Sequence, residues 1–260
     1  MGNNWLGHQI LRWLKARGEE IVALVLHPQE KSAYREEILH SAGVGPSSIF
    51  AGPELHQQHV IRAIRDLKPD IGISVLFGYV MRKEFLDLFS AGCINIHPAM
   101  LSFNRGANPN VWSIIDGTPA GVTIHFVDEG VDTGDIIAQK PILIDLTDTG
   151  GTLYRKLELA AVDLFGETWP LIASGRMPRV PQKPDQETFH HLADMKRIDE
   201  IDLERAFKAE DLIDILRART FPPYAGAYFL KEGRKIYLRL QFLDEEQLKS
   251  EMKNGTVHRD

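Results

Sequence analysis

The chain has 260 residues and a formal net charge of −6, with 43% hydrophobic and 25% charged residues. This length is sufficient for a buried core and a second, smaller module. No apolar run is long enough to cross a bilayer and no basic segment leads into one at the N-terminus, so we expect a cytoplasmic protein without a membrane span or secretory leader.

The first 175 residues alternate between apolar runs typical of strands and periodic runs typical of helices. This alternation predicts an α/β domain in which helices cover a parallel sheet. The expected strands are residues 21–26, 71–77, 93–97, 122–127 and 135–144. The expected helices are residues 5–16, 59–67, 82–89, 110–115 and 152–173.

A proline-rich junction separates this region from the rest of the chain. Pro178, Pro181 and Pro184 follow Gly175 and interrupt regular structure. We therefore place one domain at residues 1–175 and a small α+β domain at residues 176–260. In the small domain we expect a helix over residues 203–217, a turn over 221–224 and strands over 227–230 and 235–242.

The chain starts on a feature that normally follows a strand. Residues 2–7 have the pattern of a strand-to-helix turn, but no strand precedes them. Because the first strand usually lies centrally in such a sheet, we expect either a gap or unusual edge in the sheet or a misassigned start codon.

Cysteine and histidine positions do not indicate a metal cluster. Cys93 is the only cysteine and lies in an apolar run, so it is expected to pack in the core. His190, His191 and Asp194 suggest a metal site, but adjacent histidines project in different directions. We expect no metal and a solvated or acceptor-side role for this pair.

The strongest chemical signal is the segment Ile94-Asn95-Ile96-His97-Pro98. In a strand, Asn95 and His97 point to one face while the isoleucines pack into the core. The pair then lies at the carboxyl end of a strand, where ligand crevices of open α/β sheets form. The alternative is a hydrogen-bonded polar pair that caps a loop.

The second signal is the acidic loop at residues 128–135, which has the sequence DEGVDTGD. Gly130 and Gly134 permit a tight loop, and four acids in it require partners elsewhere. A calcium loop is the competing interpretation. It needs an acid or amide at its third position and a glutamate at its twelfth, where this chain has Gly130 and Gln139.

Asp132 completes a set with Asn95 and His97 if it folds back toward the histidine. It then holds the imidazole in one orientation and favours its protonated form. Transfer of an acyl-like group to an amine needs a donor to the oxyanion, a base for the attacking nitrogen and a group that positions the base. The amide, imidazole and carboxylate provide these three functions.

The chain resembles the formyltetrahydrofolate-dependent formyltransferases, which include methionyl-tRNA, glycinamide-ribonucleotide and sugar-amine enzymes. The similar segments are residues 95–98, 105–106, 121–125 and 128–135. The resemblance implies a Rossmann-like formyltransferase domain with a small C-terminal domain, N10-formyltetrahydrofolate as formyl donor, and Asn95, His97 and Asp132 as catalytic residues.

The same resemblance implies where the ligands bind. The folate residues are Phe77, Gly78, Tyr79, Val80, Met81, Asp128, Glu129 and Gly130. Residues 109–112 and 217–224 are similar to sugar N-formyltransferases, which implies a UDP- or dTDP-linked amino sugar as acceptor and a homodimer. The acceptor residues are Asn3, Asn4, Asn104, Arg105, Gly106, Trp112, Arg219, Phe221 and Tyr224.

Two other functions are weighed against this one. Methionyl-tRNA formylation predicts a basic C-terminal module, yet beyond Gly175 the chain has 16 Lys+Arg and 16 Asp+Glu, so we expect no nucleic-acid partner. A non-catalytic folate-binding or sugar-nucleotide-binding protein would not require the intact trio. His125, inside an expected strand, is interpreted as a packed core residue. No dinucleotide, P-loop or serine-hydrolase motif occurs.

Overall fold

The structure, a computed structural model, describes residues 1–183 and 187–255. Its α/β part has the strands β1 (Leu24–Leu26), β2 (Ile49–Ala51), β3 (Gly72–Val75), β4 (Cys93–His97), β5 (Arg105–Gly106), β6 (Ala120–Phe126) and β7 (Ile136–Ile142). Its helices are α1 (Asn4–Ala16), α2 (Arg35–Ala42), α3 (Gln58–Asp66), α4 (Lys83–Leu86), α5 (Pro109–Ile115) and α6 (Gly150–Ala173). Short 3-10 turns lie at Gln29–Lys31, Pro46–Ser48 and Gly52–Glu54.

All ten elements expected before Gly175 are present, with boundaries shifted by a few residues at most. The sequence did not predict α2, β2 or β5. Helix α2 was missed because only two of its residues, Ile38 and Ala42, are buried, so its sequence shows little helical periodicity of apolar residues. The strands β2 and β5 are too short to show a pattern of alternation.

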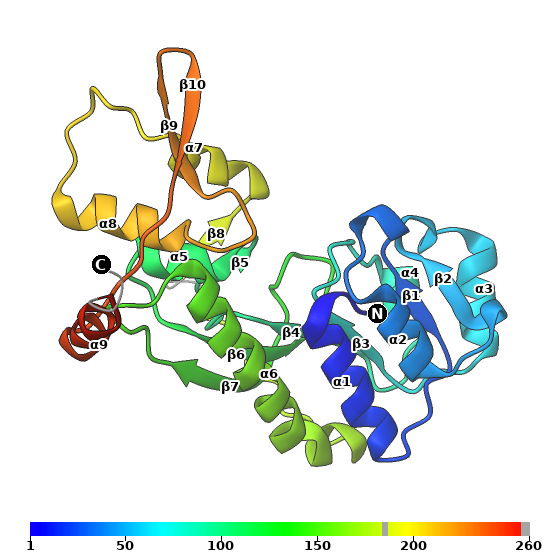
Figure 1. Cartoon of the computed structure of the whole chain (residues 1–260). Helices are drawn as coiled ribbons and strands as arrows, with labels where there is room; N and C mark the ends of the chain where they lie inside the picture. The colour runs from blue at the N-terminus through cyan, green and yellow to red at the C-terminus, as the bar shows by residue number, and fades with distance from the viewer. Residues whose placement is uncertain (184–186, 256–260) are drawn as a thin grey trace.

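The central sheet has the strand order β3-β4-β6-β7. The strands β3 and β4 are parallel, whereas β6 runs antiparallel to both of its neighbours. Helices α1 and α6 lie side by side across one face of this sheet (Figure 1). The predicted α/β architecture is confirmed. In its second half β6 runs antiparallel to β4, and a loop without a crossover helix then joins β6 to the antiparallel strand β7.

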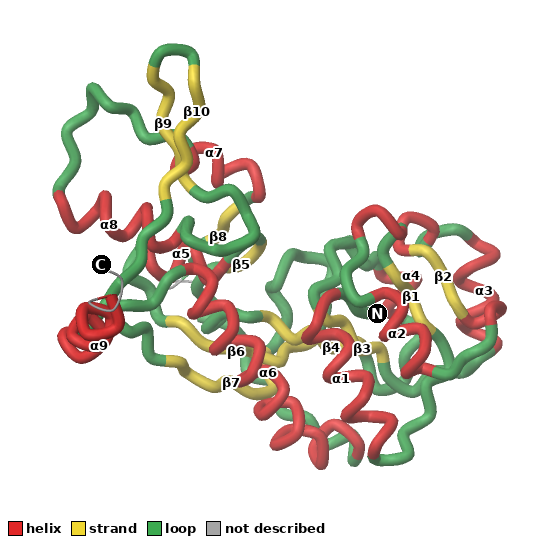
Figure 2. The backbone as a smooth tube through the Cα atoms, viewed as in Figure 1, coloured by secondary structure: helices red, strands yellow, loops and turns green. Residues whose placement is uncertain are grey.

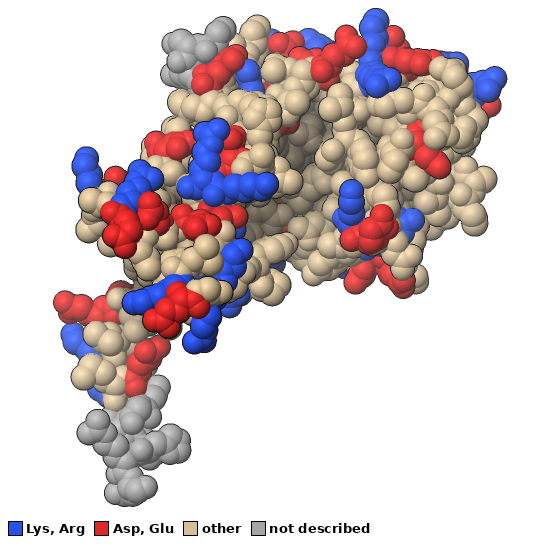
Figure 3. Space-filling view, turned by 90° about the horizontal axis from the view of Figure 1, so that it is seen from above, with Lys and Arg blue, Asp and Glu red and all other residues tan. Residues whose placement is uncertain are grey.

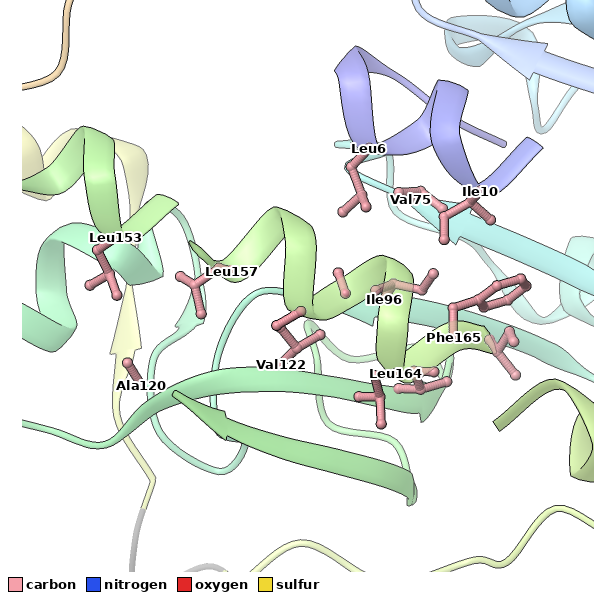
Figure 4. Close-up of a cluster of buried hydrophobic side chains, with 14 of the residues drawn as sticks. Leu6, Ile10, Val75, Ile96, Ala120, Val122, Leu153, Leu157, Leu164 and Phe165 are labelled. Atoms are coloured by element: carbon pink, nitrogen blue, oxygen red, sulfur yellow. The ribbon is translucent and has the colours of Figure 1, made fainter. Parts of the chain in front are cut away.

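The main core lies between α6 and this sheet. Figure 4 shows Leu157 and Leu164 of α6 facing the strands that carry Val122 and Ile96. Helix α6 begins with a capping box, in which the Thr149 side chain accepts from the Thr152 backbone and the Thr152 side chain accepts from the Thr149 backbone, so the start of the helix is defined at this residue.

The strands β1 and β2 form a separate parallel pair, and a gap divides them from β3. At the β3 side of this gap the first residues make a short strand-like contact: Gly2 bridges Val75 in parallel, and the amino group of Met1 donates to Ile73 O at 2.8 Å. Beyond them a cavity of about 440 Å³ is lined mainly by apolar residues from both sides, among them Val25 and Ile64, with charged residues such as Glu20 and Asp70 also in its lining. The structure therefore contains the gap that the turn at residues 2–7 predicts.

The rest of the chain forms a smaller region with β8 (Phe189–His190), a 3-10 turn at Leu192–Met195, α7 (Lys196–Asp199), α8 (Ala209–Ala218), the antiparallel hairpin β9 (Ala227–Lys231) and β10 (Arg234–Leu238), and α9 (Glu245–Gly255). Long loops precede α8 and α9 (Figure 2). The expected helix starts later than predicted, because residues 203–208 are loop and turn. No helix in the described part of the chain is long and apolar enough to cross a membrane.

The junction after α6 runs back along the first part. Gly175 has a left-handed φ of 66° directly after the helix end, and Val180 then pairs with Ile136 of β7. Farther on, β8 pairs in parallel with β5. Of the three prolines expected to mark this junction, Pro184 lies outside the described residues. The junction is therefore held against the α/β part rather than extending from it as a free linker.

The buried position of Cys93 gives a first prediction. Cys93 is 2% exposed, as the sequence predicts, and burial raises the pKa of its thiol to about 12. We expect a thiol reagent such as Ellman's reagent to react with no cysteine in the native protein at pH 8 and with one thiol after unfolding in guanidinium chloride. Fast reaction in the native state would contradict this packing.

Candidate active site

Two neighbouring strands position the polar residues of the site. Asn95 and His97 lie on one face of β4, and the register places His125 of β6 directly opposite Asn95. Asp132 lies in the loop between β6 and β7 and reaches back to the same place. The predicted meeting of Asn95, His97 and Asp132 is therefore found.

The side chains contact one another at short range. His97 Nδ1 lies 3.6 Å from Asp132 Oδ2, and Asn95 Nδ2 donates to Asp132 Oδ1 at 3.3 Å. The other ring nitrogen, His97 Nε2, lies 3.0 Å from the carbonyl oxygen of Asn104. Both ring nitrogens thus face acceptors, an arrangement that suits an N–H on each.

Asp132 is held as a carboxylate. Burial acts to raise its pKa, but the neighbouring His97 and His125 and the backbone N–H of Gly106 outweigh burial and hold the pKa of Asp132 well below its usual range. The Gly106 N–H donates to Asp132 Oδ2 at 3.0 Å. Asp132 is therefore available to orient a histidine at neutral pH.

His125 is buried, as the sequence predicts, and it also contacts the polar residues of the site. The side chain is 2% exposed, but its Nε2 lies 3.2 Å from Asn95 Nδ2 and 3.5 Å from Asp132 Oδ1. Its Nδ1 lies 2.8 Å from the carbonyl oxygen of Phe126, which as an acceptor fixes the proton on Nδ1. Only the pairing of β4 with β6 reveals this contact, and the sequence does not contain that register.

Left-handed backbone conformations gather around the site. The non-glycine residues Asn4, Leu76, Asn104, Asn108 and Asp132 have φ values of 64°, 50°, 56°, 54° and 55°. Such conformations cost about 1–3 kcal/mol each and persist where surrounding contacts fix them. Part of the free energy of folding is therefore offset by the strained backbone that positions the loops of this site.

A pocket of about 670 Å³ opens at these side chains. Of the residues predicted to bind folate or acceptor, those that line it are Asn3, Asn4, Phe77, Gly78, Tyr79, Val80, Met81, Gly106, Asp128 and Gly130, together with the trio. Lining residues that the sequence did not predict include His27, Ser74, Asn108, Tyr154, Phe189 and Leu192. His190 and His191, for which a solvated or acceptor-side role was expected, also line the pocket. Glu129 lies between two lining residues and Asn104 contacts His97 through its carbonyl oxygen, but neither residue lines the pocket.

The predicted folate loop, residues 77–81, packs against the segments that follow β1 and β2. His56 Nε2 lies 2.9 Å from Val80 O, and the ring of Tyr79 lies on Gly52, where a Cβ would come within 2.5 Å of it. His27 contacts both aromatic rings of the loop, with centroids 5.3 Å from Phe77 and 5.1 Å from Tyr79. Gly52 thus leaves the space that lets this loop pack closely.

The predicted arginine contacts to an acceptor are not supported. Arg105 is 7% exposed, and its guanidinium binds Gln182 and Glu187 instead of lining the pocket. Arg219 pairs with Asp199 at 2.7 Å. Within the described residues no lysine or arginine lines the pocket.

The predicted aromatic residues take two arrangements. Trp112 is buried and stacks on His190, with centroids 4.1 Å apart and an interplanar angle of 5°. Phe221 lies between Tyr154 of the pocket wall and the exposed Tyr224, with centroid distances of 5.2 and 5.1 Å. The second group forms an aromatic path from the pocket to the surface. In the described residues no group of His, Cys, Asp and Glu side chains is arranged to hold a metal ion.

Two protein families match successive parts of the chain. The formyl transferase family matches residues 7–168, and the N-formyltransferase dimerization C-terminal domain matches residues 194–245. The chain belongs to the formyl transferase family. The predicted enzyme class, an N-formyltransferase, is confirmed.

Individual formyltransferases similar to the chain differ in their acceptors. A methionyl-tRNA formyltransferase of Halothermothrix orenii is 34% identical over 228 residues, which cover 84% of this chain and 70% of that protein. A 4-N formyltransferase of Francisella tularensis has a TM-score of 0.76 and 27% identity, covering 94% of this chain and 96% of its own. The formyltransferase PseJ of Anoxybacillus kamchatkensis was solved with tetrahydrofolate and a UDP-linked formamido sugar. It has a TM-score of 0.54 and 29% identity, and the match covers 74% of this chain and 96% of PseJ. A reduced folate as formyl carrier, as predicted, agrees with these relatives.

Proposed function

We propose that this formyltransferase moves the formyl group of N10-formyltetrahydrofolate to the primary amine of an amino-dideoxy sugar linked to UDP or dTDP. The observation that carries the proposal is the pocket in which Asn95, His97 and Asp132 meet without a lysine or arginine among its described lining residues. Hydrogen bonds and stacking can hold a small acceptor in such a pocket, whereas a tRNA stem needs many basic contacts to phosphates.

The chemistry follows from the contacts of the trio. The unprotonated amine attacks the formyl carbon, and the Asn95 amide and protonated His97 stabilise the oxygen of the tetrahedral intermediate. Because a protonated imidazole cannot take a further proton, a water held by Asp132 accepts the proton of the amine and passes it to N10. The bond between the formyl carbon and N10 then breaks, and N10 leaves protonated. Asp132 remains a carboxylate throughout and keeps the imidazole in place.

The surroundings of the pocket support a nucleotide-linked acceptor. Asn4 donates to the hydroxyl of Tyr154 at 3.2 Å, and Tyr154 begins the aromatic path through Phe221 to the exposed Tyr224. An exposed aromatic ring offers a stacking surface for a flat base. The likeness to PseJ of Anoxybacillus kamchatkensis, which was solved with a UDP-linked formamido sugar, supports the same acceptor class.

Charge also favours a small acceptor. Figure 3 shows a face with basic and acidic side chains interspersed, and the hollow in its middle is bordered mainly by uncharged residues. The net charge of the chain is −6. The competing acceptor is initiator methionyl-tRNA, which the 34% identity to the Halothermothrix enzyme favours. A charge distribution of this kind does not attract a polyanion.

We expect UDP or dTDP alone to compete with the acceptor, and transfer to a UDP- or dTDP-linked amino sugar to depend only weakly on salt. The measurement is formyl transfer from N10-formyltetrahydrofolate to a panel of such sugars, with the product followed by mass spectrometry. Initiator methionyl-tRNA in the same assay is expected to remain unformylated. Efficient formylation of the tRNA, with affinity that falls steeply as salt rises, would replace the sugar by the tRNA.

The homodimer, the cytoplasmic location and the two-domain division at residue 175 belong to the same proposal. Support for a dimer comes from the C-terminal family match and from Leu230 and Tyr237, which are 50% and 51% exposed on the β9–β10 hairpin. Light scattering coupled to size exclusion measures the mass directly. A monomer at micromolar concentration would contradict the dimer and leave the transfer reaction unaffected.

A further inference from the structure

Gln182, in the junction after α6, lies beside the loop that carries Asp132. Its amide nitrogen donates to the carbonyl oxygens of Asp132 at 2.8 Å and Gly134 at 2.9 Å. Its amide oxygen accepts from Arg105, at 3.1 Å from Nε and 2.8 Å from the terminal nitrogen. Both amide hydrogens and both lone pairs of Gln182 are thus used, so its orientation is fully determined.

The loop that Gln182 binds needs such support. Asp132 has a left-handed φ of 55°, a conformation that an aspartate adopts at an energetic cost. At Gly134 the chain passes so close to β6 that a Cβ would come within 1.9 Å of Phe126 O. The two carbonyl oxygens that Gln182 binds therefore flank the tightest part of this loop.

Arg105 connects Gln182 to the backbone N–H that binds the Asp132 carboxylate. The neighbouring residue Gly106 is the one whose N–H donates to Asp132 Oδ2. Arg105 is itself fixed by Glu187 at 2.9 Å and by its own N–H, which donates to Thr188 O at 3.0 Å. Gln182 thus joins the backbone of Asp132 on one side to the segment that binds its carboxylate on the other.

We propose that Gln182 is a positioning residue for formyl transfer, which sets the Asp132 carboxylate against His97 by clamping the Asp132 loop to Arg105. The proposal rests on the role proposed for Asp132 and goes beyond it. Gln182 does not line the pocket. A displacement of about 1 Å in a catalytic group lowers rates by roughly a hundredfold, so a clamp of this kind affects turnover rather than affinity.

Two substitutions separate the halves of the clamp. Gln182→Met keeps the size of the side chain and removes all four hydrogen bonds. Gln182→Glu still accepts from Arg105 but cannot donate to the carbonyl oxygens of Asp132 and Gly134. The control is Ile38→Val, which destabilises a buried position far from the site. It distinguishes loss of stability from loss of alignment.

The first measurement needs no acceptor and follows the carboxyl resonance of Asp132 by NMR in protein labelled at aspartate, assigned with Asp132→Asn. The groups that face this carboxylate are His97, His125, Asn95 and the Gly106 N–H. In both Gln182 variants the pKa of Asp132 is expected to rise toward the usual aspartate range, because the carboxylate loses its alignment with these groups. In Ile38→Val it stays as in the wild type.

The second measurement is turnover with whichever acceptor the enzyme uses, the amino sugar or the tRNA. Both Gln182 variants are expected to lose about tenfold or more in kcat, with KM for donor and acceptor changed less than about threefold. An unchanged Asp132 titration, or kcat within about twofold of the wild type in Gln182→Met, overturns the proposal. Full activity in Asp132→Asn would instead show that the catalytic trio is wrong, so the two failures are distinguishable.

Discussion

Replacement of His97 by alanine, or of Asp132 by asparagine, is expected to lower kcat by about a hundredfold or more, the usual scale for a general base or oxyanion donor. His97 is the group that contacts both the carboxylate and the reacting centre in the proposed mechanism. Asp132→Asn removes the negative charge opposite His97 Nδ1 and leaves the shape of the side chain almost unchanged. Folate binding should change little, because the predicted folate loop lies at residues 77–81.

The measurement combines steady-state turnover with direct titration of a folate ligand by calorimetry. Matched controls are His40→Ala on α2 and Asp66→Asn on α3, both exposed and remote from the pocket. These controls are expected to behave as the wild type. Near-normal turnover in His97→Ala would remove the trio from the mechanism, whereas loss of folate binding in both site variants would assign them to the donor site instead.

An engineered extension of five apolar β-branched residues before Met1 is expected to raise the melting temperature by roughly 5 to 10 °C, through burial of apolar surface and new backbone pairing. Gly2 already runs parallel to β3, and the cavity of about 440 Å³ between β1 and β3 continues from it. Strands buried on both faces of a parallel sheet are continuously apolar, so every position of the extension is Val or Ile.

The extension also changes how stability depends on pH. Burial lowers the pKa of the Met1 amino group from 8.0 to about 6, so folding disfavours its proton and stability increases as pH rises from 6 to 8. The extended protein has no amino group at this position and should lose that dependence. Calorimetry at pH 6 and pH 8 measures both effects. The control is a Gly-Ser extension of equal length, and an equal melting temperature for both extensions would show that the cavity does not accept a strand.

The sequence was sufficient to place Asn95 and His97 on one face of a strand. Alternation in residues 93–97 is a local property, and the structure reproduces this strand with the same bounds. The apolar period of α6 is a local signal of the same kind, and the helix was found where it was expected. The proposed contact of Asp132 with His97 required only that one short loop fold back.

Contacts that depend on register or on distant segments could not be predicted in this way. His125 enters the site because β6 pairs antiparallel to β4, and no local pattern specifies the residue opposite Asn95. Arg105 was expected to bind the acceptor because an arginine beside a catalytic strand suits an anion. The structure surrounds it with Gln182 and Glu187, which lie 77 and 82 positions later in the chain.

The sequence by itself indicated the α/β architecture, the formyltransferase family and the meeting of Asn95, His97 and Asp132, because strand alternation, helix periodicity and short motifs are encoded in neighbouring residues. Only the tertiary structure decided which side chains complete the site. The antiparallel half of the sheet brings His125 to Asn95, and the return of the junction along β7 brings Gln182 to Asp132. The contacts of His125 and of Gln182 join segments that are far apart in the chain, so no local sequence pattern specifies them. They form only when burial of the shared core fixes how the segments pair.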